Sequence, residues 1–543
     1  MSERPPRPAA TVVVLRDGPR GPEALLLRRA ERGDHNSGAW VFPGGLVDAA
    51  DHAAAVHAGR FDAAAAATRL RTDAPTALAH WAAAVRECVE ECALLFAAPA
   101  LPVERLQGWR APLARGERSL AELCAAEGLT LTFGALVYLS HWITPVGRAK
   151  RFDTRFFVAR APAGQQPSHD ADELVEQRWL RPAEALDAAA ALKLMTPTRR
   201  TLEWLRRFGD VESALAWARA QAEVPPILGR VATGSRGERP VAPDEPAWAE
   251  IGRLDPAGHG HALYEIRAGH PVRLSPRVIR VTAGNPGVMT GPGTNSYLVG
   301  GGPRNTWAVI DPGPDDAGHV EALLAAAPGP IEAILATHTH RDHSPAAQRL
   351  RERTGARLLG RLADHAQRQD DSFRPDQPLA GGETLALDGA TLQVIHTPGH
   401  ASNHLCYLLL EERLLFTGDH VMQGSTVVID PPDGDMAAYL ASLQALRALE
   451  LDWLAPGHGF LIAPPRAAFE RLIAHRLRRE AKVLEALRSL GPAPAEALLA
   501  RVYDDVPTRM HPVALRSLLA HLVKLRAEGA IDERGGRWAA ARD

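Results

Sequence analysis

The hydrophobic pattern divides the chain into segments of different character. From about residue 8 to 186, short apolar runs of β type, such as TVVVL, surround a long alanine-rich stretch with a helical pattern. Residues 222–262 are rich in proline and glycine, which indicates a connector. After it, apolar strand patterns alternate with Gly- and Pro-rich turns, and three amphipathic helical patterns end the chain. These boundaries predict four parts: 8–221, 222–262, 263–465 and 466–543.

Length and composition agree with a multidomain globular protein. A chain of 543 residues exceeds what one ordinary hydrophobic core organises, so two or three domains are expected. Hydrophobic residues make up 46% and charged residues 23%, which is typical of globular domains. The apolar runs are too short and interrupted to cross a bilayer, and the opening MSERPPRPAATVVVLRDG lacks the apolar core of a signal peptide. We therefore expect a cytoplasmic location and no membrane partner.

Charge and cysteine usage exclude two further classes. A net charge of −2 excludes a generally basic protein that coats nucleic acid. Four cysteines in so long a chain argue against a disulfide framework. Cys88 and Cys92 are one helical turn apart, but no second pair or nearby histidine completes a metal site. We interpret them as buried thiols.

Histidines and aspartates gather between residues 338 and 458. The stretch ILATHTHRDHSPA places His338 and His340 in alternation after an apolar run, so both side chains point the same way. Further polar residues each follow an apolar, strand-like run and lie in a Gly- or Pro-containing turn. The candidate ligands are His338, His340, Asp342, His343, His400, Asp419 and His458. Ligands displayed on successive loops at one sheet edge converge.

The chemistry of these side chains indicates two metal ions. Imidazole nitrogen with carboxylate oxygen, and no thiolate, suits zinc, and manganese or iron less well. We assign His338, His340 and His400 to one ion and Asp342, His343 and His458 to the other, with Asp419 bridging them. Three protein ligands and a bridge leave an open position on each ion. Such a pair activates water for hydrolysis at neutral pH.

This motif resembles the metallo-β-lactamase superfamily, whose members fold as an αββα sandwich. Asp311, at the end of the apolar run WAVI, matches the family's first motif and would orient the site without binding metal. We count Asp342 and Asp311 as the catalytic carboxylates. The resemblance implies a metal-dependent hydrolase with two zinc ions.

A narrower resemblance covers residues 270–540. RVTAGNPGVMTGPGTNSYLVG, TPGHASNH and the helical tail are similar to the branch that contains the mitochondrial β-lactamase-like endoribonuclease for single-stranded RNA. The resemblance implies that the tail is a small winged-helix domain with three helices and a β wing. Residues 466–543 hold 15 Arg plus Lys against 10 Asp plus Glu. A basic helix face with Arg476, Arg478 and Arg479 would contact phosphates or form ordinary solvated surface.

The amino-terminal half carries a carboxylate cluster. Glu87, Glu90 and Glu91 are spaced i, i+3 and i+4, so on a helix they point to one side. Carboxylates so grouped repel one another unless a cation lies among them, and their hard oxygens favour Mg²⁺ or Mn²⁺. An ordinary solvated helix face is the alternative.

These residues resemble the Nudix box, with supporting residues at Gly45, Asp51 and Arg86. Asp51 replaces the usual glutamate, residues 52–85 separate it from Arg86 where the family has a much shorter spacer, and Ala93 replaces a glycine. The resemblance is to the subgroup that includes coenzyme A diphosphatases, and it implies an α/β/α sandwich that hydrolyses a pyrophosphate bond with Mg²⁺. Asp172 or Glu173 would supply a base. A domain retained only for binding or packing is the alternative.

The sequence therefore predicts an α+β multidomain hydrolase: a Nudix sandwich, an αββα sandwich and a winged-helix tail. We expect the second half to cleave phosphodiester bonds of single-stranded RNA, and the Nudix half to hydrolyse a nucleoside-diphosphate-linked compound. A thioesterase that acts on acyl-CoA, coupled to a coenzyme A diphosphatase-like Nudix half, is the alternative. A chain that only binds nucleotides and recruits partners is a third. Motifs alone set neither the substrate nor the oligomeric state.

Overall fold

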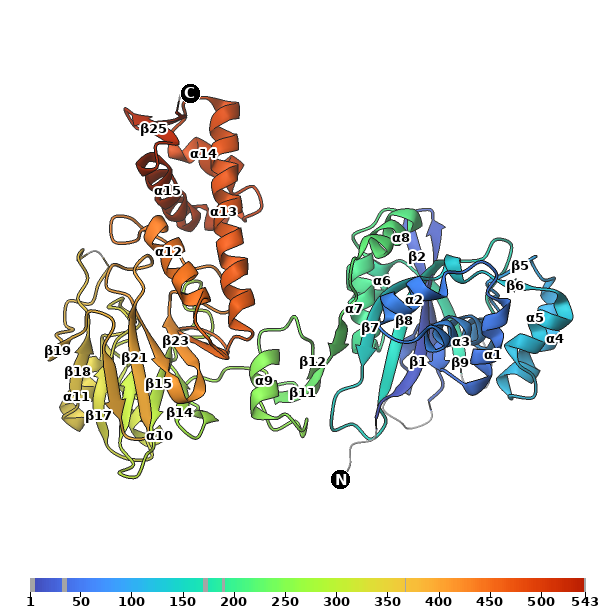
Figure 1. Ribbon diagram of the computed structural model, residues 1–543, viewed down its shortest axis with the longest axis horizontal. Helices are drawn as coiled ribbons and strands as arrows, with labels where there is room; N and C mark the ends of the chain where they lie inside the picture. Colours follow the sequence, from blue (N-terminus) through green and yellow to red (C-terminus); the bar gives the residue numbers. More distant parts are fainter. Residues whose placement is uncertain (1–4, 32–36, 169–173, 188–190, 367, 542–543) are drawn as a thin grey trace. The chain divides into compact units, whose positions relative to one another are not determined.

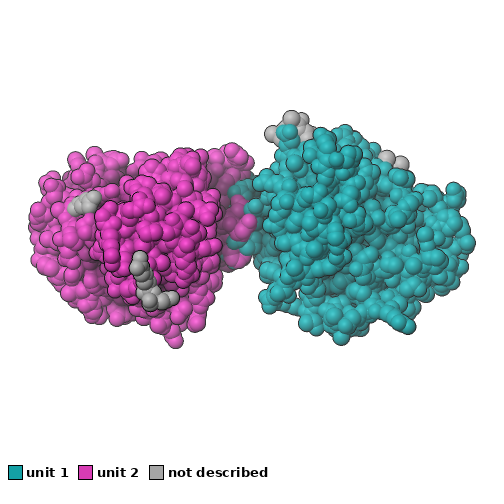
Figure 2. Space-filling view, turned by 90° about the horizontal axis from the view of Figure 1, so that it is seen from above, with its two compact units in different colours: residues 1–232, 238–243, 257–260 teal, residues 233–237, 244–256, 261–543 magenta. Residues whose placement is uncertain are grey.

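The computed structural model describes residues 5–31, 37–168, 174–187, 191–366 and 368–541. The chain splits into two compact units, which Figure 2 colours teal and magenta. Unit 1 comprises residues 1–232, 238–243 and 257–260, and unit 2 comprises residues 233–237, 244–256 and 261–543. Each unit has its own hydrophobic core.

Unit 1 is built on an eight-stranded mixed sheet. Its main strand order is β10-β7-β8-β1-β2-β3, while β4 pairs with β1 and β9 pairs with β2. The strands are β1 (Arg7–Gly18), β2 (Gly21–Arg29), β3 (Trp40–Val41), β4 (Gly44–Leu46), β7 (Val137–Ile143), β8 (Phe152–Arg160), β9 (Leu174–Leu180) and β10 (Pro226–Leu228). The short strands β5 (Ala97–Ala98) and β6 (Thr130–Leu131) form a separate pair.

Helices cover both faces of this sheet. Successive strand residues point to opposite sides, so each face carries its own apolar side chains for the helices to cover. In β1, Val12 and Val14 enter the core shared with α3, while Val13 and Leu15 enter the core shared with α7 and α8. The helices are α1 (Ala49–Ala54), α2 (Ala63–Leu70), α3 (Ala74–Cys92), α4 (Val103–Ala114), α5 (Leu120–Glu127), α6 (Pro182–Leu186), α7 (Thr196–Leu205) and α8 (Val211–Ala220). This is the expected α/β/α arrangement.

The proline- and glycine-rich stretch contains regular elements. They are β11 (Arg230–Gly234), β12 (Gly237–Val241) and α9 (Trp248–Leu254). Helix α9 packs within unit 2 through Glu250, whose carboxylate forms a buried two-point ion pair with Arg280 of strand β14 (Val278–Thr282). Part of the expected connector is thus integral to the second unit.

Unit 2 contains two sheets. The seven-stranded sheet has the order β13-β14-β15-β16-β17-β18-β19 and the five-stranded sheet the order β20-β21-β22-β23-β24. The first has β13 (Val272–Ser275), β14 (Val278–Thr282), β15 (Asn295–Gly300), β16 (Trp307–Ile310), β17 (Ile331–Leu335), β18 (Arg357–Gly360) and β19 (Gln377–Pro378). The second has β20 (Thr384–Leu387), β21 (Ala390–His396), β22 (Leu405–Leu409), β23 (Leu414–Gly418) and β24 (Trp453–Pro456).

The two sheets pack face to face between layers of helices, as Figure 1 shows. Tyr297, Tyr407 and Phe416 lie in the apolar layer between the sheets. The outer face of the first sheet packs against α10 (Ala317–Ala326) and α11 (Ala346–Thr354). The outer face of the second packs against α12 (Met436–Arg447) and α13 (Pro465–Leu490). This layering is the predicted αββα sandwich.

The carboxyl-terminal tail has the predicted winged-helix pattern. Helix α13 is followed by α14 (Ala495–Val502), α15 (His511–Ala527) and a hairpin of β25 (Ile531–Arg534) with β26 (Arg537–Ala540). Val483, Leu498, Leu522 and Trp538 are among the side chains of its core. In the described part of the chain, no helix combines the length and apolar character that spanning a membrane requires.

Candidate metal centre

The seven predicted ligands lie at one edge of the sandwich, beyond the ends of four strands. The paired strands β16 and β17 run parallel, as do β23 and β24, so their carboxyl ends meet at one edge. The turn after β17 carries the first four ligands. His400 follows β21, Asp419 follows β23 and His458 follows β24. The ligand atoms form two groups: His338, His340 and His400, and Asp342, His343, Asp419 and His458.

Within each group, every pair of ligand atoms lies within 4.8 Å. His400 Nε2 lies 3.0 Å from His340 Nδ1. His343 Nε2 lies 3.4 Å from an oxygen of Asp342 and 3.4 Å from Asp419 Oδ1. Two nitrogens bound to one tetrahedral zinc are about 3.3 Å apart, given Zn–N bonds of about 2.0–2.1 Å. The spacing therefore fits one ion in each group.

Asp419 faces both groups. Its Oδ1 lies 3.2 Å from His458 Nε2, while its Oδ2 lies 3.7 Å from His400 Nε2. One carboxylate thus presents one oxygen to each candidate ion position, which is the geometry that a bridging ligand needs. The bridging role proposed for Asp419 gains support from this arrangement.

The imidazole rings are oriented by hydrogen bonds on their outer nitrogens. His338 Nδ1 lies 3.0 Å from Thr337 Oγ1, and His343 Nδ1 lies 2.9 Å from Asp311 Oδ2. The Nδ1 atoms of His400 and His458 contact the main-chain carbonyls of Val428 and Gly293 at 2.8 and 3.1 Å. In the neutral form of each imidazole, a proton on Nδ1 satisfies these contacts, and the Nε2 lone pair is then directed toward the site.

Several inward atoms lack a hydrogen-bond partner among the described residues, and this is the structural test of a metal site. The buried atoms His338 Nε2, His343 Nε2, His458 Nε2 and Asp419 Oδ1 have no hydrogen-bond partner among the described residues. Buried polar atoms are normally satisfied, so four orphaned atoms pointing at one another call for a ligand. All of them are metal-binding atom types, so the residues fit divalent cations.

The charges around the two positions differ. Burial lowers the pKa of His340 to about 3, and it also lowers the pKa of His338 and His400, so the first group is neutral. In the second group, burial opposes protonation of His458, but the Asp419 and Asp342 carboxylates raise its pKa to about 9. The second group therefore attracts positive charge strongly, as a divalent cation requires.

Asp311 supports the site without joining either ligand group. It is buried, and its carboxylate accepts hydrogen bonds from the backbone N–H and hydroxyl of Thr337 at 2.7 and 2.8 Å. The same carboxylate accepts the hydrogen bond of His343. Asp311 has a left-handed φ of 51°, an uncommon conformation for aspartate, which aims its side chain into the turn. Thr337, which the sequence analysis did not single out, precedes His338 directly.

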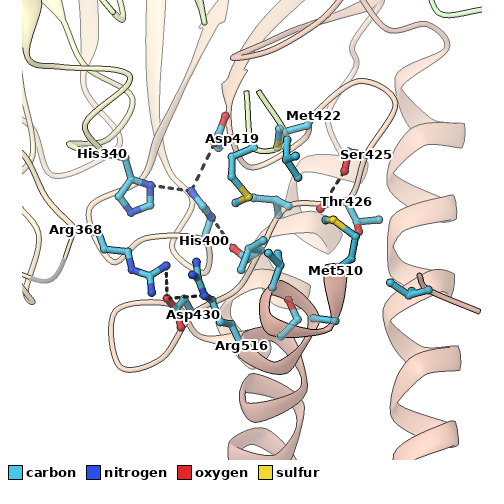
Figure 3. Close-up of a pocket in the computed structure, with 18 of the residues that line it drawn as sticks. His340, Arg368, His400, Asp419, Met422, Ser425, Thr426, Asp430, Met510 and Arg516 are labelled. Atoms are coloured by element: carbon cyan, nitrogen blue, oxygen red, sulfur yellow. Dashed lines mark hydrogen bonds and ion pairs between the residues drawn. The ribbon is translucent and has the colours of Figure 1, made fainter. Parts of the chain in front are cut away.

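A cavity of about 610 Å³ opens beside the ligands (Figure 3). His340, Asp342, His400 and Asp419 form its floor. Much of the remaining wall is aliphatic, and it comes from three loops and from α15. These apolar lining residues are Val288, Met289, Met422, Val427, Val428, Val506, Met510, Val513 and Ala514. The winged-helix tail therefore forms part of the wall of the candidate active site.

The predicted glutamate cluster of unit 1 lies at the carboxyl end of α3. Arg86 is at its centre: its guanidinium contacts Asp51 at 2.9 and 3.1 Å, Glu87 at 2.9 Å and Glu90 at 3.2 Å. Glu91 accepts a hydrogen bond from the backbone N–H of Gly44 at 2.8 Å. The structure thus brings all of these predicted residues together.

Arg86 contacts one oxygen of Glu87 and one of Glu90 through the same Nη1 atom, so each carboxylate has a second oxygen that can bind a cation. Burial raises the pKa of Glu87 to about 7 and also raises the pKa of Glu90. A divalent cation would reverse both shifts. Among the described residues, the glutamates do not form a group whose ligand atoms all lie within 4.8 Å of one another.

Two departures from the Nudix pattern have local explanations. Ala93 adopts the left-handed conformation, with φ 55° and ψ 34°, that glycine commonly takes after a helix, so α3 still ends where the pattern requires. The segment between Asp51 and Arg86 folds as helices packed on α3, so it does not separate the two residues in space. Gly45 is required because a Cβ there would lie 2.3 Å from Glu87 Oε1. Asp172 and Glu173 lie outside the described residues.

The basic helix face described in the sequence analysis forms only in part, since Arg478 is exposed. Arg476 and Arg479 do not lie on a solvated helix face, since both are buried. Arg476 donates to the Val427 carbonyl and stacks over Tyr439, and Arg479 pairs with Asp505. Their helical spacing was compatible with exposure, but α12 and α14 cover that side of α13. The four cysteines are free and buried, as expected.

Three segments of the chain match known families. Residues 289–458 match the metallo-beta-lactamase superfamily, residues 54–200 match the NUDT19 Nudix domain, and residues 495–538 match the beta-lactamase associated winged helix domain. A beta-lactamase-like protein 2 homolog from Caenorhabditis elegans is 31% identical over 264 residues, which cover 48% of this chain and 88% of that protein. The chain belongs to the metallo-β-lactamase superfamily.

Proteins with other names show a similar degree of sequence identity. An atrochrysone carboxyl ACP thioesterase from Aspergillus fumigatus is 32% identical over 275 residues, covering 47% of this chain and 84% of that protein. The crystal structure of a metallo-beta-lactamase family protein from Thermus thermophilus is 26% identical, covers 49% of this chain and 99% of that one, and has a TM-score of 0.42.

The three family matches confirm the predicted fold class. The chain is a metallo-β-lactamase hydrolase fused to an amino-terminal Nudix domain and a carboxyl-terminal winged-helix domain. Its cluster of histidine and aspartate side chains fits a divalent metal site.

Proposed function

We propose that the metallo-β-lactamase domain hydrolyses the thioester of an acyl group carried on a phosphopantetheine arm, such as that of coenzyme A. The observation that carries the proposal is the cavity beside the ligands. Methionine and valine side chains from loops and from α15 form an apolar part of its wall, which suits an acyl chain. The similarity to an enzyme named as an acyl-carrier thioesterase adds support.

The same cavity argues against single-stranded RNA, which the sequence analysis placed first. RNA is bound in positively charged grooves where bases stack on aromatic side chains. Among the described residues that line this cavity, Tyr503 is the one Phe, Tyr or Trp. Aspartates offset part of the charge of the five arginines among these described residues: Arg479 pairs with Asp505, and Arg368 and Arg516 share Asp430. We therefore reverse the order of the two hypotheses.

The proposed cofactor of this domain is a pair of zinc ions, held by the two ligand groups with Asp419 between them. When bound, the ions polarise the thioester carbonyl and lower the pKa of water. Asp342 is ionised because the neighbouring histidines outweigh its burial and lower its pKa, and it lines the cavity. Its carboxylate accepts a hydrogen bond from the attacking water and orients it. Water adds to the carbonyl carbon, the C–S bond breaks, and the thiol leaves with a proton.

The Nudix half has a compatible substrate. We propose that it binds Mg²⁺ or Mn²⁺ through Glu87, Glu90 and Glu91 and hydrolyses the pyrophosphate bond of a coenzyme A derivative or related nucleotide. Arg86 holds Glu87 and Glu90 side by side, and Gly44 fixes Glu91. One chain would then remove the acyl group in one half and cleave the carrier in the other.

The first experiment incubates the purified, metal-loaded chain with octanoyl-CoA and, separately, with single-stranded RNA. We expect thiol release by the wild type, a loss of at least about a hundredfold in His340→Ala, and no loss in Glu90→Ala. Pyrophosphate cleavage should show the opposite dependence on the two variants. RNA cleavage that His340→Ala abolishes, without thiol release by the wild type, would refute the thioesterase proposal.

A second experiment tests the apolar wall itself. Ala514→Phe fills the cavity from α15, so it should reduce kcat/KM for octanoyl-CoA by about tenfold or more and leave acetyl-CoA hydrolysis within about twofold. Val523→Phe on the same helix is the matched control, because Val523 is 43% exposed and does not line the cavity. Equal losses on both substrates would show that the wall does not hold the acyl chain.

A further inference from the structure

Two arginines in the wall of the cavity share one carboxylate. Arg368 Nη1 lies 2.8 Å from Asp430 Oδ2, and Arg516 Nε lies 4.0 Å from the same oxygen. Figure 3 shows both guanidinium groups directed toward Asp430 in the cavity that contains His340 and His400. Two positive groups and one negative group give this cluster a net positive charge.

The position of Arg368 is set by its backbone conformation and by the contacts of the next residue, Gln369. Arg368 has a left-handed φ of 65°, which is uncommon for a residue other than glycine and marks a conformation imposed by surrounding contacts. Gln369 is buried, accepts a hydrogen bond from Thr339 Oγ1 at 2.6 Å and donates one to Asp433 Oδ2 at 2.9 Å. Thr339 lies between His338 and His340, so the arginine is fixed relative to the metal-binding turn.

The other two members of the cluster are also tied together. Arg516 and Ser517 lie on α15, and the Ser517 hydroxyl accepts a hydrogen bond from the backbone N–H of Ile429 at 3.3 Å. Ile429 directly precedes Asp430. The three charged groups therefore come from two loops and the winged-helix tail, and main-chain contacts anchor them beside the cavity.

One carboxylate oxygen does not satisfy two guanidinium groups. Each guanidinium presents five N–H donors in a planar fork suited to two-point binding of carboxylate or phosphate, whereas the two ion pairs here use the same oxygen. The side chains of Arg368 and Arg516 are 44% and 34% exposed, which places them at the rim of the cavity. If the acyl chain of the proposed substrate contacts the apolar wall, the carrier of the thioester would lie at this rim.

We propose that Arg368 and Arg516 form a phosphate subsite that binds the phosphopantetheine carrier of the thioester, in competition with Asp430. The proposal rests on the thioesterase function proposed above. It makes the two arginines specificity-determining residues that bind substrate and take no part in bond cleavage. They should therefore act on KM and leave kcat unchanged.

The test uses three thioesters with the same octanoyl group, carried on coenzyme A, on phosphopantetheine and on pantetheine, which lacks phosphate. All assays use the full chain in a Glu90→Ala background, so that the Nudix half does not consume the carrier. Arg368→Gln and Arg516→Gln should each raise KM for the phosphate-bearing thioesters by roughly ten- to a hundredfold, as expected for a lost charge-assisted hydrogen bond. KM for octanoyl-pantetheine and all kcat values should stay within about twofold.

Two further variants complete the test. The first controls for the loss of any paired arginine, and the second tests competition between Asp430 and phosphate. Arg413→Gln removes another arginine paired with an aspartate, Asp452, which does not line the cavity, and it should change none of the three KM values. Asp430→Asn removes the internal competitor while keeping its shape, and it should lower KM for the phosphate-bearing thioesters. An effect on octanoyl-CoA without one on octanoyl-phosphopantetheine would assign the subsite to the additional phosphates of coenzyme A.

The outcomes separate the subsite from the proposed function. A wild type that hydrolyses none of the three thioesters refutes the thioesterase function. A wild type that hydrolyses all three with equal KM, or arginine variants that keep the preference for phosphate, refute the subsite while the function stands. Equal KM increases on all three substrates, including octanoyl-pantetheine, would show that the arginines have a structural role.

Discussion

At the scale of single residues, Gly457 lies where no side chain fits. It precedes the ligand His458, and a Cβ there would lie 2.7 Å from Asp419 Oδ1 and 2.8 Å from His343 Cε1. Gly457→Ala should therefore displace two ligands of the second group and reduce bound metal to about half of the wild-type content, with a drop in affinity of at least about tenfold.

Elemental analysis of the purified variant measures this effect. Gly209→Ala is the matched control, because a Cβ at Gly209 meets nothing within 4 Å. Full metal content in Gly457→Ala would show that the second group does not bind an ion.

His319 predicts a pH dependence of stability. It is buried on α10 with Nε2 2.8 Å from Ser296 Oγ, and burial lowers its pKa to about 4 from an ordinary value of about 6.5. The unfolded chain therefore takes up a proton that the folded chain refuses, so stability falls as pH drops from about 6.5 toward 4. At pH 5 the loss from this group is about 2 kcal/mol.

Urea unfolding at pH 7 and pH 5 tests this assignment. His319→Gln removes the titrating group, so the variant should lose about 2 kcal/mol less than the wild type between the two pH values. The informative quantity is the difference in this loss between the wild type and His319→Gln, because other buried histidines also titrate. An identical pH dependence in both proteins would rule out His319 as a contributor.

At the scale of secondary-structure elements, a buried ion pair fastens α9 to the sandwich. The Glu250 carboxylate accepts hydrogen bonds from Arg280 at 2.6 and 2.9 Å and from the Leu461 backbone N–H at 2.8 Å. Glu250→Ala would leave Arg280, which is 2% exposed, without a counter-ion. We expect a loss of about 3–5 kcal/mol in the stability of unit 2.

Chemical denaturation measures that loss against two comparisons. Glu212→Ala breaks an exposed pair with Arg219 and should cost less than about 1 kcal/mol. The double variant Glu250→Leu with Arg280→Met removes both charges and should recover part of the stability. If Glu250→Ala and Glu212→Ala cost the same, the pair does not anchor the helix.

The elements also show how far sequence reasoning extends. The convergence of the candidate ligands could be predicted because they lie in turns that follow apolar runs, so local order fixes their positions at strand ends. The winged-helix elements could be predicted because their periodicity is local. In contrast, the pairing of Glu250 with Arg280 joins a proline-rich stretch to a strand, and only packing reveals it. The cluster of Arg368, Asp430 and Arg516 was missed for the same reason, since no spacing connects its members.

At the scale of the whole molecule, each unit should respond separately to metal. Unit 2 contains the buried ligand atoms without partners, so bound ions stabilise its folded state in proportion to their affinity, by about 4 kcal/mol at a thousandfold excess over Kd. Unit 1 has its own two cores and none of these ligands. Removal of zinc by a chelator should lower the midpoint temperature of one of two calorimetric transitions, that of unit 2. The midpoint temperature of the other transition should stay unchanged.

Differential scanning calorimetry with and without chelator checks this expectation. His340→Ala should behave like the chelated wild type in the transition of unit 2. A single transition that shifts as a whole would show that the two units unfold together.

Because α15 lines the cavity, changes in the winged-helix tail can change substrate specificity. The residues proposed to perform the reaction lie at the strand ends of the sandwich, whereas Met510, Val513, Ala514 and Arg516 reach the same space from the winged helix. Exchange of the tail would therefore alter which molecules are accepted without disturbing the chemistry that is performed on them. Proteins that share one catalytic domain can act on different substrates in this way, through changes in the attached winged-helix domain.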